Sequence, residues 1–233
     1  MRLTPYGQRE LAWLTIIAGA VCAALTVTAW LASPWALVAL PAPLAVGAWG
    51  VWFFRDPPRR PPDGEDLVVS AADGRVADIT PVGADGPLGE SGVRVGVFMS
   101  IFNVHVNRAP LDARVTRIVH HPGRFFDARS PEALERNESV AIGMACGFGD
   151  GERTVLVRQV AGKVARRIVT DLAEGQAVTR GQRIGMIKFG SRLEVYLPAS
   201  LSPDVRVAVG QRVTAGESVL ARLQPDRPQE TAP

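Results

Sequence analysis

A long stretch of the sequence, from Leu11 to Phe54, contains no charged residue. At about 1.5 Å per residue, it can form two helices that each cross an apolar layer of roughly 30 Å. Ser33-Pro34 is the expected break, which predicts helices at 11–31 and 35–54, the second kinked or re-entrant because it contains prolines. The remaining chain must therefore fold as a domain attached to a membrane-associating segment.

Positive charges flank this apolar stretch on both sides. Arg2 and Arg9 precede it, and Arg55, Arg59 and Arg60 follow it. Because basic residues are retained on the cytoplasmic side of a membrane, we expect a hairpin in the cell membrane with the rest of the chain on the cytoplasmic side. A signal peptide is disfavoured, since the run is too long and no small-residue cleavage site stands out. Spanning the bilayer and lying in one leaflet both remain open.

The composition narrows the classes of partner. Hydrophobic residues make up 47% of the chain and the net charge is +3, without a long Lys/Arg run. An anionic membrane surface therefore fits the excess charge better than nucleic acid, and no nucleic-acid partner is expected. Cys22 and Cys146 do not form a disulfide or metal-binding pattern, and no metal is expected. Any histidine chemistry must use His105, His120 or His121.

Changes in composition divide the chain into four predicted segments. Residues 1–54 form the membrane-associating helices, and residues 55–66 form a Pro-rich, semi-rigid linker. Residues 67–223 carry short apolar runs between Gly, Pro and Asp, which is typical of a mostly β domain. Residues 224–233 are polar and Pro-rich, which predicts disorder. Within the β domain, strands are predicted at 67–70, 93–98, 114–119, 154–160 and 205–209, and one helical turn at 131–136.

An internal repeat refines the fold class. Residues 175–184 and 210–219 share the pattern Gly-Gln-x-Val-Thr-x-Gly-x-x-Ile/Val. Each copy predicts a strand, a glycine turn and a second strand. We therefore expect a barrel-sandwich-like domain of β-hairpins behind the hydrophobic helical hairpin, similar to biotinyl or lipoyl carrier domains.

A polar cluster lies in the segment 100–110. If this segment is extended, Asn103, His105 and Asn107 share one face, because side chains alternate along a strand. A surface strand with a solvated histidine is the alternative interpretation. The opposite face is predicted to enter the core and consists of Phe102, Val104 and Val106.

Two dipeptides have both a structural and a chemical interpretation. Asp73-Gly74 is typical of a turn, but Asp73 could also orient a histidine, as in catalytic triads. Gly190-Ser191 is the single Gly-Ser pair in the sequence and follows an expected strand at 184–189. It predicts either an ordinary turn or a strained bond, because glycine permits unusual backbone torsions.

The combination of these segments resembles phosphatidylserine decarboxylases of the short bacterial type (type A). The matching segments occur in the order of that family and cover most of residues 53 to 198. The Asn-Val-His segment and the Phe-Gly-Ser segment are the most specific of them. The segments are 53–57, 72–76, 98–110, 122–125, 136–138 and 188–192.

The resemblance implies a self-processing enzyme. Ser191 would attack the carbonyl of Gly190, and β-elimination would cut the chain into a β chain (1–190) and an α chain (191–233). Ser191 would become a pyruvoyl group that forms a Schiff base with the substrate amine and withdraws electrons during decarboxylation of phosphatidylserine to phosphatidylethanolamine. Neither pyridoxal phosphate nor a metal would be required, and the two chains would remain together as a heterodimer.

The resemblance also implies roles for individual residues. Asp73 and His105 would assist Ser191, and His105 would also donate a proton after decarboxylation. Asn103, Asn107, Arg108 and His121 would contribute to the substrate pocket. Longer bacterial forms carry a His-x-x-His pair in this segment, whereas here Phe102 and Arg108 lie three residues either side of His105. Either His105 takes both roles or His121 substitutes.

The hydrophobic hairpin fits a lipid substrate. Each buried CH₂ contributes about 0.8 kcal/mol, so a phospholipid does not easily leave the bilayer and its enzyme should stay at the surface. A membrane-anchored adaptor or carrier without catalysis is the main alternative, but Lys188 lacks the Met-Lys-Met context of a modified lysine. A pyruvoyl enzyme acting on a soluble amino acid is a second alternative, against which the hairpin argues. Acyl-chain preference and further oligomerisation are left open.

Overall fold

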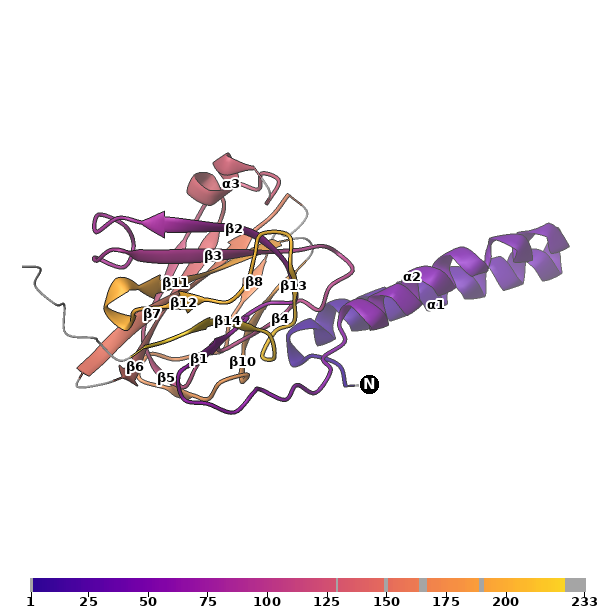
Figure 1. Ribbon diagram of the computed structural model, residues 1–233. Helices are drawn as coiled ribbons and strands as arrows, with labels where there is room; N and C mark the ends of the chain where they lie inside the picture. The colour runs from indigo at the N-terminus through magenta and orange to yellow at the C-terminus, as the bar shows by residue number, and fades with distance from the viewer. Residues whose placement is uncertain (1, 129, 149–150, 164–166, 189–190, 225–233) are drawn as a thin grey trace, which may run out of the picture. The chain divides into compact units, whose positions relative to one another are not determined.

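The computed structural model describes residues 2–128, 130–148, 151–163, 167–188 and 191–224. The chain divides into two compact units, Met1–Pro58 and Arg59–Pro233. The first unit is helical and the second consists mostly of strands, as Figure 1 shows. The predicted fold class, a mostly β domain that follows an apolar helical hairpin, is confirmed.

Two apolar helices make up the first unit. Helix α1 (Gln8–Leu31) and helix α2 (Pro41–Phe53) are joined by the 3-10 helix η2 (Pro34–Ala39), and η1 (Pro5–Gly7) precedes them. The turn at Pro34 follows from its fixed φ angle and missing N–H group. The helices approach closely at Gly50, where a Cβ would lie 2.1 Å from Leu14 Cδ2.

The hairpin exposes its apolar side chains. No residue of α1 is buried, and Trp30 and Trp35 beside the turn are 84% and 80% exposed. Together with the 3-10 helices that precede them, α1 and α2 form two helical spans, Pro5–Leu31 and Pro34–Phe53, that are long and apolar enough to cross a membrane. Such an apolar surface is unfavourable in water, so the hairpin is compatible with membrane association.

The strands of the second unit form one eight-stranded and two three-stranded sheets within the described residues. All strand pairs are antiparallel, and the large sheet has the order β13-β2-β3-β11-β7-β6-β5-β9. The small sheets have the orders β1-β14-β12 and β4-β10-β8. The bounds are β1 (Leu67–Val69), β2 (Gly74–Val82), β3 (Gly92–Met99), β4 (Val106–Arg108), β5 (Ala113–His121), β6 (Ser139–Phe148), β7 (Gly151–Ala161), β8 (Ile168–Val169), β9 (Ala177–Val178), β10 (Arg183–Ile187), β11 (Ser191–Pro198), β12 (Asp204–Val205), β13 (Arg212–Val213) and β14 (Val219–Arg222).

The large sheet curls around the hydrophobic core (Figure 1). Register shifts between Val76 and Asp78 in β2 and between Val115 and Arg117 in β5 bend these strands, since an irregularity of this kind increases the local twist. Residues from all three sheets enter one core cluster, which includes Val97, Leu193, Val157, Ile184 and Leu220.

The internal repeat has the predicted strand, glycine turn and strand in both copies. Strands β9 and β10 flank the first turn, and β13 and β14 flank the second. Gly181 and Gly216 occupy equivalent positions with φ angles of 79° and 76°. Residues that carry a side chain rarely adopt this left-handed backbone conformation, which explains why glycine occupies the same place in each copy.

Several sequence predictions for the β domain are confirmed and one is wrong. Strands β1, β3, β5 and β7 and the helix α3 (Pro131–Arg136) lie where they were expected. The strand predicted at 205–209 is wrong beyond Val205, because the chain turns between Ala208 and Gln211 and the Gln211 N–H donates to the Ala208 carbonyl over 3.1 Å. Strands β2, β6, β8 and β11 were not predicted. Most of the predicted tail at 224–233 lies outside the described residues.

Candidate active site

Ser191 is the first residue of β11, which lies in the middle of the large sheet. It pairs with Met99 of β3 on one side and with Ala161 of β7 on the other. Its side chain is fully buried, and its Oγ has no hydrogen-bond partner among the described residues. A buried hydroxyl without a partner costs free energy, so its presence points to a chemical role rather than to stability.

The chain changes sheets immediately before Ser191. Strand β10 belongs to a small sheet and ends at Ile187, whereas β11 belongs to the large sheet. Lys188 is buried, and its backbone N–H donates to the Arg167 carbonyl over 3.1 Å. Gly190 lies outside the described residues. The chain therefore passes from one sheet to another between Ile187 and Ser191.

A tight turn connects β3 to His105. Asn103 Oδ1 accepts hydrogen bonds from the Ser100 N–H (2.9 Å) and the Ser100 hydroxyl (2.8 Å), and the Asn103 N–H donates to the Ser100 carbonyl (2.9 Å). His105 Nδ1 lies 3.0 Å from the Asn103 carbonyl oxygen. A carbonyl can only accept, so Nδ1 carries the proton of the neutral ring and the lone pair is on Nε2.

For this segment, the structure corrects the expected polar face and the expected burial of Phe102, and it excludes one alternative interpretation of His105. Asn103 lies in the turn and the strand β4 begins at Val106, so the three polar residues do not form one extended face. His105 is fully buried, which excludes the solvated surface histidine. Phe102 was expected in the core but is 62% exposed, because it lies at the tip of the turn. Val104 and Val106 are buried as expected.

Asn107 of β4 connects its small sheet to the large sheet. Its Oδ1 accepts a 2.8 Å hydrogen bond from Gln159 Nε2 in β7, and its Nδ2 contacts the Met99 sulfur at 3.7 Å. Met99 is the residue directly opposite Ser191. The Asn107 amide therefore contacts the strands on both sides of β11.

The strand registers bring the His105 segment to the Ser191 segment. Val106 pairs with Met186 in β10, so continuing the antiparallel register places His105 opposite Ile187, four residues before Ser191. Met99 pairs with Ser191 and contacts Asn107, two residues after His105. Residues that are far apart in the sequence thus meet where β10 leads into β11.

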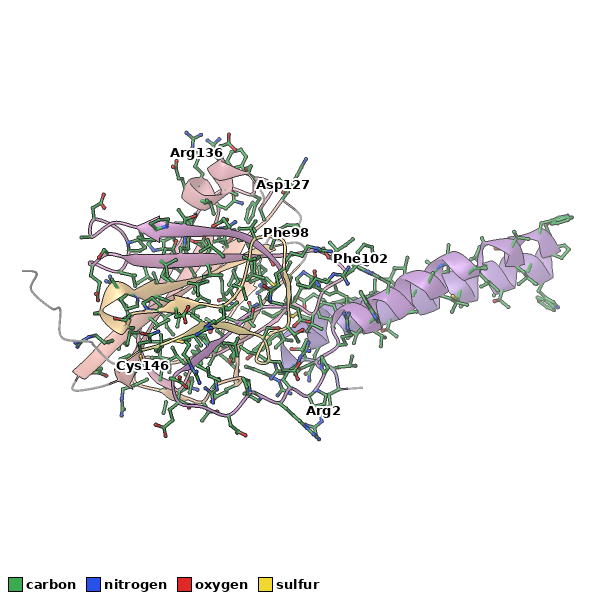
Figure 2. All side chains as sticks on the ribbon, viewed as in Figure 1. Arg2, Phe98, Phe102, Asp127, Arg136 and Cys146 are labelled. Carbon is green, nitrogen blue, oxygen red and sulfur yellow. The ribbon has the colours of Figure 1, made fainter. Side chains whose placement is uncertain are left out.

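Asp73 lines a cavity that is also bordered by β13 and by the turn that follows β3. Its carboxylate accepts hydrogen bonds from Arg59 Nη2 at 2.8 and 3.0 Å and from the Ala215 N–H at 2.8 Å. The cavity has a volume of about 590 Å³ and is lined by Asp73, Ser100, Phe102 and Asn103 among others. Phe98 and Phe102, which both line it, are labelled in Figure 2.

Arg108 and His121 have different surroundings. Arg108 is buried, and its Nη1 donates to the Gly181 carbonyl over 2.8 Å, which fixes it against the first repeat turn. His121 is exposed at the end of β5 and borders two shallower cavities. It pairs with Ser139, Ser139 pairs with Val160, and Val160 pairs with Arg192. His121 is thus three strands, about 14 Å, from β11 and in register with Arg192 rather than Ser191.

Sequence reasoning missed Gln159 and Arg59 as parts of this site. Gln159 is fully buried, and it follows Val155 and Val157 on the same face of β7. A polar residue within such an alternating apolar pattern is a signal that could have been noticed. Arg59 was attributed to the flank of the hairpin, and no pattern in the sequence pairs it with Asp73.

Other reactive groups lie elsewhere. Burial raises the pKa of the Cys146 thiol, and Figure 2 shows Cys146 at the opposite end of the strands from Phe98 and Phe102. Within the described residues, no three His, Cys, Asp or Glu side chains gather as metal ligands would.

The comparisons with known proteins identify the chain as an enzyme. The family model described as phosphatidylserine decarboxylase matches residues 46–221. A phosphatidylserine decarboxylase proenzyme of Cereibacter sphaeroides is 48% identical over 178 residues, which cover 75% of each chain. That of Zymomonas mobilis is 44% identical over 216 residues, which cover 89% of this chain and 83% of the relative. The chain belongs to the phosphatidylserine decarboxylase family.

Proposed function

We propose that this protein decarboxylates phosphatidylserine to phosphatidylethanolamine with a pyruvoyl group that it makes from Ser191. The observation that carries the proposal is the buried Ser191 Oγ, which has no hydrogen-bond partner among the described residues at the junction of two sheets. A hydroxyl in that environment is a nucleophile held next to its own peptide bond. Membership of the decarboxylase family supports the same conclusion.

Maturation begins with an acyl shift. Ser191 Oγ attacks the Gly190 carbonyl carbon, and the amide C–N bond breaks, which gives an ester and a free amine on residue 191. Removal of the Cα proton then breaks the Cβ–Oγ bond and leaves Gly190 with a carboxylate. Water replaces the nitrogen, ammonia leaves, and residue 191 ends as a pyruvoyl group. The products are a β chain of residues 1–190 and an α chain of residues 191–233.

His105 is the proposed base for this reaction. Its Nδ1 is held by the Asn103 carbonyl, so the neutral ring directs its basic Nε2 away from that turn. Longer bacterial forms carry a second histidine three residues away, but here those positions are Phe102 and Arg108, and Arg108 binds the Gly181 carbonyl. We therefore assign both proton-transfer roles to His105. His121 is disfavoured, because the register places it on the Arg192 row, three strands from Ser191.

Asp73 and the turn at Asn103 form the proposed substrate pocket. The cavity of about 590 Å³ that they line is also bordered by Phe98, the residue before Met99 in β3. A pyruvoyl group at residue 191 would supply an electrophilic carbonyl for the substrate amine and an acceptor for the electrons released when carbon dioxide leaves. The chain's own residues orient the serine head group and supply the proton that replaces the carboxylate.

The exposed apolar hairpin supports a lipid substrate over a soluble amino acid. Its surface needs an apolar environment, and an enzyme that acts on a phospholipid must reach the head group at the membrane. We propose that the hairpin holds the enzyme in the cell membrane with the β domain on the cytoplasmic side.

Mass spectrometry of the purified full chain under denaturing conditions tests this proposal. We expect two chains that meet between residues 190 and 191, the smaller one lighter by one ammonia than the unmodified peptide, and phosphatidylethanolamine formation in detergent micelles that contain phosphatidylserine. Ser191→Ala should remain uncut and inactive, whereas Ser139→Ala, at a buried serine of β6 in the same sheet, should be cut normally. An uncut chain with full activity would refute the pyruvoyl role.

A further inference from the structure

The face of β11 opposite Ser191 is charged but buried. Ser191, Leu193 and Val195 alternate with Arg192, Glu194 and Tyr196 along the strand. Arg192, Glu194 and Tyr196 are only 4%, 0% and 3% exposed. Buried charges are costly unless they are paired, so this face must contain its own partners.

Glu194 lies at the centre of the charged and polar groups on this face. Its carboxylate accepts hydrogen bonds from Arg192 Nε (2.9 Å) and from the Tyr196 hydroxyl (2.7 Å), both on β11. Arg94 Nε of β3 and Arg158 Nη1 of β7 each lie 3.7 Å from the same carboxylate. Glu194 therefore faces one arginine from each of the two neighbouring strands.

Asp78 of β2 extends the cluster by one strand. Its carboxylate forms ion pairs with Arg192 Nη2 at 2.5 Å and with Arg94 Nη2 at 3.2 Å. Burial acts to lower the pKa of the Arg94 guanidinium, but the charges of Glu194 and Asp78 outweigh it and raise that pKa above its ordinary value. We name the six residues Asp78, Arg94, Arg158, Arg192, Glu194 and Tyr196 the β11 ion cluster.

Gly96 makes room for this cluster. Asp78, Gly96, Glu194 and Arg158 lie in one row across β2, β3, β11 and β7. A Cβ on Gly96 would lie 2.0 Å from Arg192 Nη2 and 2.6 Å from its Cζ. The guanidinium of Arg192 thus fills the place in the row that a side chain at position 96 would occupy.

The cluster lies across the proposed cut. Arg192, Glu194 and Tyr196 belong to the small chain that begins at Ser191, whereas Asp78, Arg94 and Arg158 belong to the large chain. After the cut, residue 191 is a chain end with no covalent link to β10. We propose that the β11 ion cluster clamps this new chain end between β3 and β7 and so positions the group made from Ser191; this inference rests on the proposed function.

The clamp acts through Arg192, the residue next to the reacting one. Its ion pair with Asp78 and its hydrogen bond to Glu194 fix one face of β11, and this in turn fixes the direction in which residue 191 points. Arg192 and Glu194 are positioning residues in this proposal and do not touch the substrate. Their loss should therefore reduce kcat more than it changes KM.

Two variants and one matched control test the clamp in the full-length enzyme. Glu194→Gln removes the charge with almost no change in volume, and Gly96→Ala displaces the Arg192 guanidinium. Gly147→Ala is the control, since Gly147 lies in β6 of the same sheet and nothing lies within 4 Å of an added Cβ. We expect kcat per cleaved chain to fall about tenfold or more in both variants, KM to change less than about threefold, and the control to match the wild type. Adding Arg192→Lys to Gly96→Ala should recover part of kcat, because the lysine head group is smaller.

Hydrogen exchange supplies a readout that does not depend on maturation. In an uncut Ser191→Ala background, Glu194→Gln should speed exchange of the amides of β11 while leaving those of β5 unchanged. Cut variants with normal kcat, or exchange that rises equally throughout the sheet, would overturn the clamp and leave the proposed function intact. A wild-type chain that never cuts would instead overturn the proposed function on which the clamp rests.

Discussion

Asn107 and Gln159 join two sheets through a buried 2.8 Å hydrogen bond from Gln159 Nε2 to Asn107 Oδ1. Asn107 belongs to the small sheet that contains β10, and Gln159 belongs to β7 of the large sheet. Both residues are fully buried. The bond therefore holds together the two sheets between which the chain crosses just before Ser191.

Replacing one partner of this bond should be costly. We expect Gln159→Leu to lower the free energy of unfolding by about 1–3 kcal/mol, because it leaves the buried Asn107 amide without its partner. Urea unfolding in detergent is best measured in a Ser191→Ala background, where a single uncut chain is followed. In the double variant with Asn107→Leu the losses should be less than additive. Strict additivity would show that the two amides do not depend on each other.

The choice between the two histidines can be decided by maturation rates. His105→Gln should slow the cut at Gly190-Ser191 by about 100-fold or more, the usual contribution of a positioned base. His121→Gln is the matched control and should mature at the normal rate, since His121 is exposed and three strands away. The appearance of the small chain can be timed by mass spectrometry after synthesis in vitro. The reverse pattern would assign the base to His121.

Arg59 forms ion pairs with two carboxylates that differ in burial. Its partner Asp73 has a side chain only 14% exposed, whereas its partner Glu217 is 37% exposed. Asp73→Asn should lower the free energy of unfolding by about 1–3 kcal/mol, and Glu217→Gln by about 1 kcal/mol at most, because solvent screens the more exposed pair. Unfolding of both variants in the uncut background measures the difference. Equal losses would mean that burial does not decide the strength of these pairs.

Tyr196 should make the free energy of unfolding depend on pH in the alkaline range. Burial and the charge of Glu194 raise the pKa of the Tyr196 hydroxyl above its ordinary value of about 10. The unfolded chain then releases this proton at a lower pH than the folded chain. The contribution to stability is complete below about pH 10 and is lost as pH rises toward the pKa of the folded state.

Unfolding experiments across this pH range test whether the free energy of unfolding falls as the pH rises. In the uncut background, the free energy of unfolding should fall as the pH rises above about 10, and Tyr196→Phe should make that fall shallower. Cys146→Ala removes the other residue whose pKa is raised by burial and serves as the control for its contribution. A steeper fall in Tyr196→Phe would contradict the assignment.

The parts of the fold that the sequence predicted are those with strong local signals. The uncharged run predicted the hairpin, and alternating apolar residues predicted β3 and β7. Strand β6 lacks such a signal, since Gly143 and Gly147 interrupt it and glycine has low strand propensity. Strand β2 contains Pro81 and a register shift at Asp78, so its pattern does not alternate cleanly.

In the candidate site, too, the residues with a local sequence signal could be predicted and the contacts between distant segments could not. Ser191 and His105 could be named because short segments around them resemble a family, although their roles stay predictions. The contacts of Asn107 with Gln159 and of Asp73 with Arg59 could not be predicted from the sequence, since they depend on how distant parts of the chain align. The β11 ion cluster illustrates this most clearly, because Asp78 and Glu194 are brought together by the pairing of three strands, β2, β3 and β11.

The place of β11 within the sheet has a consequence for biosynthesis. Both of its neighbours, β3 and β7, precede it in the chain, so β11 can pair with them only after the ribosome has synthesised the chain as far as Pro198. Under the proposed function, the cofactor therefore arises only in molecules that have finished folding. A truncated or misassembled copy would stay chemically inert, and self-processing would serve as the enzyme's own quality control.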